Sequence, residues 1–112
     1  MFFFGPIFQS AMKPTETAQE IINTIGLISL FMIGASAYEY YENGVSFRIY
    51  GSIKFNHVLI EIDSINDEHF NFIFKKYCSR TEKELKSKRV EGVLFSDLRA
   101  TITKETDLFT QI

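Results

Sequence analysis

The residue types best suited to chemistry form a basic segment in the C-terminal half of this sequence. Positions 75 to 89 contain seven lysines and arginines but only two glutamates. Anionic lipid headgroups attract such a cluster by about 1 kcal/mol per base near a membrane surface. The segment therefore predicts contact with an anionic lipid or an acidic partner, and its alternative is a solvated surface that keeps the domain soluble. The basic residues are Lys75, Lys76, Arg80, Lys83, Lys86, Lys88 and Arg89.

Two smaller groups have weaker claims to chemistry. His57, Glu61 and Asp63 would face the same way on a regular strand, and histidine with carboxylates can bind a divalent metal. Cys78 could act as a nucleophile only beside an activating base, and the candidate base, His69, is nine residues away. Because a solvent-facing strand is normally polar and a lone thiol is normally inert, we expect neither a metal site nor a catalytic residue.

The rest of the composition narrows the class of protein. The sequence carries no phosphate-binding loop, zinc spacing or nucleophile constellation, so we expect a protein that is not an enzyme and needs no cofactor. Twelve basic and fourteen acidic residues do not favour nucleic-acid binding. A single cysteine excludes an intramolecular disulfide. At 112 residues we expect one domain with an appended anchor or core helix.

An uncharged stretch of seventeen residues, Ile21–Ala37, must be buried somewhere. Thr17 and Glu20 have the spacing of a capping box, which predicts a helix that starts there. Seventeen residues rise by roughly 25 Å, slightly less than a ~30 Å hydrocarbon core. Two environments stay open: a membrane-spanning anchor, which we favour because the rest of the chain is small, or a helix buried in a soluble core or a homodimer interface.

The flanks of this stretch bear on its orientation. Tyr38, Tyr40 and Tyr41 lie where an aromatic belt would mark a membrane interface. Lys13 lies on one flank and Arg48 and Lys54 lie on the other, so the positive-inside rule places the C-terminal domain in the cytoplasm. If the helix does not span, the tyrosines are ordinary sheet residues and the protein is cytoplasmic.

From Tyr38 the apolar period becomes two, which predicts strands. Asn43-Gly44 is a strong hairpin signal, because a type I′ turn needs positive φ at both central positions. Gly51-Ser52 fits a second two-residue turn. The pattern predicts three antiparallel strands at about 38–42, 45–50 and 53–62.

Residues 66–89 allow two interpretations. Alternating phenylalanines favour a strand at 69–76 followed by a charged loop or short helix, whereas helical spacing from Asn66 favours a helix. A fifth strand from about Arg89 and a terminal helix capped by Ser96-Asp97 follow. The predicted fold is α+β, with an N-terminal apolar helix, an antiparallel meander of four to five strands and a C-terminal helix. Residues 1–37 form the apolar segment and residues 38–112 form the β-rich domain.

The segments YEYYENGVSFRIYGSIKF and VLIEIDSI, after an apolar anchor, resemble the start of bacterial pleckstrin-homology-like domains tethered to membrane spans. LFSDL and the terminal helix resemble the closing elements of that family. At Phe55–Val58 the acid that the family often carries is missing. The resemblance covers residues 38–112 and implies an interaction or lipid-surface module without catalysis.

These observations together predict a non-enzymatic, membrane-associated binding or regulatory module with a β-rich domain at the cytoplasmic face. Its partner would be the membrane, with anionic lipid touching the basic segment, or a protein. The alternative is a soluble interaction protein, for instance an inhibitor or immunity-type protein, whose apolar helix is core or a homodimer interface.

Overall fold

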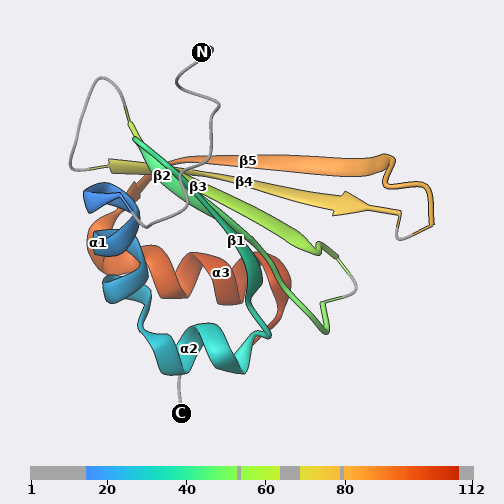
Figure 1. Ribbon diagram of the computed structural model, residues 1–112, viewed down its shortest axis with the longest axis horizontal. Helices are drawn as coiled ribbons and strands as arrows, with labels where there is room; N and C mark the ends of the chain where they lie inside the picture. The colour runs from blue at the N-terminus through green and yellow to red at the C-terminus, as the bar shows by residue number, and fades with distance from the viewer. Residues whose placement is uncertain (1–14, 53, 64–68, 79, 109–112) are drawn as a thin grey trace, which may run out of the picture.

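One antiparallel sheet and a layer of helices on one of its faces make up the fold (Figure 1). The computed structural model describes residues 15–52, 54–63, 69–78 and 80–108. Within them the class is α+β, and five strands follow one another in chain order as a meander. The strands are β1 Ser36–Tyr41, β2 Gly44–Arg48, β3 His57–Ile62, β4 His69–Tyr77 and β5 Glu84–Leu94. The helices are α1 Glu16–Ile25, α2 Leu27–Met32 and α3 Leu98–Thr106, with a 3-10 turn, η2, at Phe95–Asp97.

Strand β4 confirms that alternating phenylalanines indicate a strand. Phe70, Phe72 and Phe74 are buried under the helices, and the side chains between them point to the other face of the sheet. The strand prediction at 69–76 is therefore confirmed and the helical interpretation is wrong. Asn66, its expected cap, lies outside the described residues.

Strand β5 corrects the expected charged loop or short helix. Glu84–Arg89 already belong to the strand, which pairs with β4 from Glu84 opposite Tyr77 to Leu94 opposite His69. Because β5 lies at the edge of the sheet, its charged side chains stay in water, and edge lysines also discourage pairing with another chain. The predicted fifth strand from about Arg89 is thus confirmed, and its charged first part, Glu84–Lys88, has no apolar alternation that would indicate a strand.

Helix α1 starts two residues before the expected capping box. Thr15 is the N-cap, and its hydroxyl accepts a hydrogen bond from the Ala18 amide (3.2 Å). The same hydroxyl donates to the Tyr41 carbonyl (2.6 Å), so it also ties the helix to β1. Thr17 is not the cap. The side of α1 that faces the sheet consists of Ala18, Ile21, Ile22 and Ile25.

Gly26 divides the uncharged stretch into two helices, so the expected single apolar helix is wrong. Its backbone has φ 93° and ψ 140°, a conformation that side chains rarely adopt, and its amide bonds to the Ile22 carbonyl (2.8 Å). Helix α1 before it is amphipathic rather than apolar, and α2 after it has six residues. No helix among the described residues is long and apolar enough to cross a membrane.

The first hairpin is confirmed, but its turn differs from the prediction. Glu42 and Asn43 form the turn, and Gly44 is the first residue of β2, paired with Tyr41. Gly44 does not have positive φ. It is needed for another reason: a Cβ there would collide with the Ile60 carbonyl oxygen of β3. The glycine thus permits a close approach of two strands.

The connection after β2 is longer than the predicted two-residue turn. Strand β3 begins at His57, not near position 53, and Ile53 lies outside the described residues. The Ser52 hydroxyl accepts from the Phe55 amide (3.3 Å) and donates to the Thr106 carbonyl (2.9 Å). A side chain, rather than a tight turn, therefore holds this connection against the end of α3.

The terminal helix is confirmed as α3, which starts at Leu98 after the η2 turn. Asp97 occupies its N-cap position without a side-chain cap hydrogen bond in the described part of the chain. Leu98 and Ile102, four residues apart, are both buried. This spacing gives α3 an apolar side toward the sheet.

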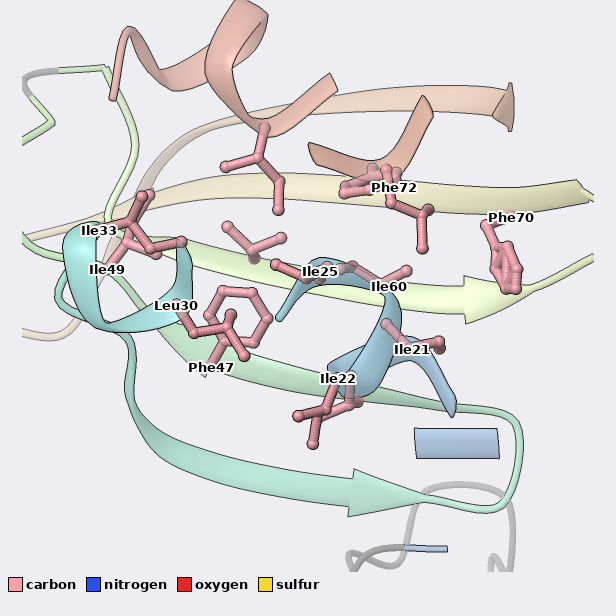
Figure 2. Packing of buried hydrophobic residues seen from close by; sticks show 14 of the residues in the cluster. Ile21, Ile22, Ile25, Leu30, Ile33, Phe47, Ile49, Ile60, Phe70 and Phe72 are labelled. Atoms are coloured by element: carbon pink, nitrogen blue, oxygen red, sulfur yellow. The ribbon is translucent and has the colours of Figure 1, made fainter. Parts of the chain in front are cut away.

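The helices and the sheet share one hydrophobic core. Figure 2 shows Leu30 and Ile33 of the uncharged stretch beside Phe47 and Ile49 of the second strand region. The core also contains the apolar side of α1 and the phenylalanines of β4. Part of the uncharged stretch is thus buried by the protein itself.

Candidate functional site

Helix α2 carries an exposed apolar surface, which is the candidate functional site of this fold. Leu27 is 73% exposed, Ile28 64%, Phe31 85% and Met32 40%, and Tyr50, 84% exposed, adjoins the end of the helix. Tyr50 donates its amide hydrogen to the Ile33 carbonyl (3.0 Å). We call these five side chains the α2 ridge. Large contiguous apolar surfaces of this kind mark interaction sites.

The backbone around α2 explains why the ridge faces outward. Gly26 redirects the chain, after which Leu30 and Ile33 reach the core and Ser29 is buried beside them. In an α-helix, the positions between such residues must point the opposite way. Gly34 permits close contact, because a Cβ there would lie 2.7 Å from the Cβ of Tyr50. Two glycines therefore bring apolar side chains of α2 and Tyr50 to the surface together.

The basic segment does not form one surface. Lys86 and Lys88 point toward the helical face of the sheet: the Lys86 ammonium lies 4.8 Å from the ring centroid of Phe55, and the Lys88 ammonium lies 2.8 Å from the Glu105 carboxylate. Lys76 of β4 lies directly opposite Lys86 of β5 in the strand register, so its side chain lies on the same face of the sheet.

The opposite face carries two further bases of the segment. Lys75 pairs with Glu84 (3.1 Å), which raises the pKa of Lys75, and Arg89 contacts Glu61 (3.5 Å) and Glu91. Exposed pairs of this kind contribute little stability, but they reduce the charge that the segment presents to a ligand.

The last two bases occupy the tip of the β4–β5 hairpin. Arg80 and Lys83 are exposed there, and Figure 1 shows that this hairpin extends beyond the helical layer. The seven bases are thus divided between two faces and a tip, away from the α2 ridge.

The three tyrosines predicted at a membrane interface all lie in β1 and make sheet contacts. The Tyr38 ring stacks parallel to Tyr40 (centroids 6.3 Å apart) and packs at 5.7 Å against Phe47. Burial raises the pKa of Tyr38. Tyr41 lies on the other face and donates to the Glu39 carboxylate (3.0 Å).

Cys78 and His69 do not meet. His69 opens β4 and Cys78 follows its last residue, so the length of the strand, about 30 Å at ~3.3 Å per residue, separates them. Hydrogen bonds from Thr81 and then from Arg80 hold the pKa of the Cys78 thiol below its usual range. The strand therefore keeps His69 away from the thiol.

His57 and Glu61 share the face of the sheet opposite the helices, as predicted, while Asp63 follows the end of β3. Among the residues described by the structure, no group of three or more His, Cys, Asp or Glu could hold a metal ion. His57 instead lines a small pocket of about 300 Å³. Its lining residues are Ala37, Glu39, Arg48, His57, Tyr77 and Glu82.

The surroundings of the His57 ring disfavour its charged form. Its Nδ1 is buried and has no hydrogen-bond partner within the described ranges, and its ring meets the Tyr77 ring edge-on at 5.6 Å. Burial, followed by Lys75 and Arg48, lowers the pKa of His57, and Glu39 opposes them.

We expect His57 to make the protein less stable in mild acid. Its folded pKa lies below the unfolded value near 6.5, so the unfolded chain binds the proton first as the pH falls. The stabilisation is present above pH 6.5 and is lost as the pH falls toward the folded pKa. Urea unfolding between pH 7.5 and pH 5 (a range of about one unit or more either side of the free-histidine pKa) should show a shallower pH dependence in His57→Gln. An NMR titration of His57 at or above pH 6.5 would contradict this expectation.

Comparison of the chain with protein families, curated proteins and solved structures finds no match. The candidate site is therefore described from the geometry of the described residues. An antiparallel sheet is covered on one face by helices, and α2 in this helical layer carries the exposed side chains of the α2 ridge.

Proposed function

We propose that this protein is a non-enzymatic binding module that docks on a membrane surface through the α2 ridge. The supporting observation is the exposure of large apolar side chains at four of the six positions of α2, a helix without charge. Tyr50, with an apolar ring and a polar hydroxyl, lies at the edge of the ridge, where interfacial aromatic residues are favoured. The resemblance to pleckstrin-homology-like domains, which are often lipid-surface modules, agrees with this proposal.

The short length of α2 favours a helix that lies in the membrane interface. Six residues rise by about 9 Å, far less than a ~30 Å hydrocarbon core. Apolar faces of interfacial helices enter about 5–10 Å into the headgroup boundary. A helix in that plane has no flanks on opposite sides of the bilayer, so flanking charges assign it no orientation.

The expected affinity is modest. Fully burying an aliphatic or aromatic side chain contributes about 1.5–3 kcal/mol, so Leu27, Ile28 and Phe31 together supply roughly 3–7 kcal/mol after scaling by their exposure. This equals the membrane binding of about one myristoyl chain, which is marginal and reversible. The module would therefore bind as a peripheral protein.

The size of the ridge favours lipid over a protein partner. Its five side chains present on the order of 500 Å² of apolar surface when full side-chain areas are scaled by exposed fractions. A stable protein interface buries about 800 Å² on each partner. A bilayer sets no such minimum, because any inserted side chain leaves water.

Vesicle sedimentation tests the proposal. The chain should sediment with phosphatidylcholine vesicles, and the double variant Ile28→Ser/Phe31→Ser should bind at least about tenfold more weakly, since 1.4 kcal/mol is a factor of ten. Both side chains are exposed, so the variant should keep its thermal midpoint. The control is Leu85→Ser, which removes another exposed leucine, 60% exposed on β5, and should leave binding unchanged.

The same experiment has clear contrary outcomes. Equal loss of binding in Leu85→Ser, or no sedimentation of the unmodified chain, would overturn membrane docking. A homodimer in solution that the double variant dissociates would assign the α2 ridge to a second copy of the chain instead. Adding phosphatidylserine measures the contribution of the basic segment, which should be small and sensitive to salt because its charges are divided and partly paired.

A further inference from the structure

A second concavity lies between α1 and the junction of β5 with η2, separate from the α2 ridge. We infer that it is a binding site for a small organic cation, that is, a protonated amine on an apolar or aromatic body. The pocket measures about 590 Å³. Small-molecule sites typically enclose ~300–1,000 Å³. Its lining residues are Thr17, Glu20, Thr24, Ile62, Phe70, Leu94, Phe95 and Ser96.

One wall of the pocket is apolar and aromatic. Phe70 and Phe95 stack with ring centroids 5.6 Å apart and an angle of 23° between their planes. Phe95 remains 40% exposed and Leu94 46% exposed, so this wall offers surface to a ligand rather than to the core. An aromatic face attracts a cation through its quadrupole, in addition to burying apolar area.

Another part of the lining comes from one side of α1. Thr17, Glu20 and Thr24 follow helical spacing and therefore line up along the pocket. The Thr24 hydroxyl is oriented by its hydrogen bond to the Glu20 carbonyl (2.8 Å). The Glu20 carboxylate has no ion pair or hydrogen bond in the described part of the chain.

The charge of the pocket selects the ligand class. Glu20 is the one charged side chain among the described residues that line it, and none of them is basic. A carboxylate in the lining of a pocket that also has an aromatic wall attracts an ammonium group and repels an acid of the same shape. A neutral molecule would gain the apolar contacts alone. The pocket therefore matches an aromatic amine better than the corresponding alcohol or acid.

The test compares three probes with a shared phenyl body: 2-phenylethylamine, 2-phenylethanol and 3-phenylpropionate. In NMR titrations of the full chain, the amine should bind with a dissociation constant on the order of a millimolar or tighter. It should bind about threefold to tenfold more tightly than the alcohol, because Glu20 is exposed to solvent and its ion pair is screened. The acid should bind least, and shifts should centre on Thr17, Phe70 and Phe95.

Glu20→Gln should reduce the affinity for the amine to that for the alcohol, and it should leave the affinity for the alcohol unchanged. Glu16→Gln is the matched control, since it removes a carboxylate from the same helix outside the pocket lining. Equal or tighter binding of the acid, the same loss in Glu16→Gln, no binding of the amine, or shifts centred on the α2 ridge would each overturn the inference. Vesicle sedimentation tests membrane docking separately, because the α2 ridge and the lining of this pocket share no residue.

Discussion

Replacing Phe72 with alanine is expected to lower the free energy of unfolding by about 3–5 kcal/mol, the cost typical of removing a buried phenylalanine. Phe72 is fully buried, and its ring stacks on Phe74 with centroids 5.4 Å apart. It lies between Ile60 on β3 and Val90 on β5 in the sheet register. The substitution would therefore leave a cavity where three strands and the helical layer meet. Small domains are stable by about 5–15 kcal/mol, so a large part of the protein's stability would be lost.

Urea unfolding followed by circular dichroism measures this loss. Ile73→Ala is the matched control, since Ile73 is the next residue of β4, points to the opposite face and is half-buried. It should cost clearly less than Phe72→Ala. If the two variants were equally stable, the helices would not cover the face of β4 that the structure assigns to them.

The sheet was predictable where its side chains alternate between apolar and polar. The phenylalanines of β4 and the apolar residues of β2 do so, and both became strands with the expected face toward the core. Strand β5 was predictable only in its last residues, because an edge strand beyond the core has no need of apolar side chains.

The α2 ridge was not predictable from composition. Leu27 and Leu30 belong to one uncharged stretch, yet one is 73% exposed and the other 1%. The difference arises at Gly26, where a backbone conformation open to glycine ends one helix and starts the next at a new angle. The sequence marks the glycine but does not say whether the helix continues through it, because packing against the sheet decides that.

The division of the basic segment had a signal in the sequence. Side chains of a strand alternate between its two faces. Because this segment is a strand, Lys86 and Lys88 lie on one face of the sheet and Arg89 lies on the other. Only one part of the pocket beside α1 was predictable from the sequence. The spacing of Thr17, Glu20 and Thr24 indicates one helix face, but Phe70 and Phe95 join it only through the topology of the sheet.

Gly44→Ala is expected to destabilise the protein by about 3 kcal/mol, at the upper end of the cost of overpacking. The added methyl group would collide with the Ile60 carbonyl oxygen and approach the Glu61 Cα at 2.8 Å. Backbone atoms of a paired strand cannot rotate away as a side chain can, so β2 and β3 would have to separate where their ladder begins, at Gly44 opposite Glu61. Thermal or urea unfolding measures the effect, with Glu42→Ala in the exposed turn as a control that should change stability by less than about 0.5 kcal/mol.

Gly44→Asn separates this explanation from the role that the Asn-Gly pair suggests. If Gly44 served as a turn residue with positive φ, asparagine would be tolerated better than alanine, because asparagine enters the left-handed region more readily. In the structure Gly44 is a strand residue and the obstacle is steric, so the larger asparagine should be at least as destabilising as alanine. If Gly44→Asn were more stable than Gly44→Ala, Gly44 would act as a turn residue with positive φ instead. The expected order instead makes the close approach of β2 to β3 the reason that glycine occupies this position.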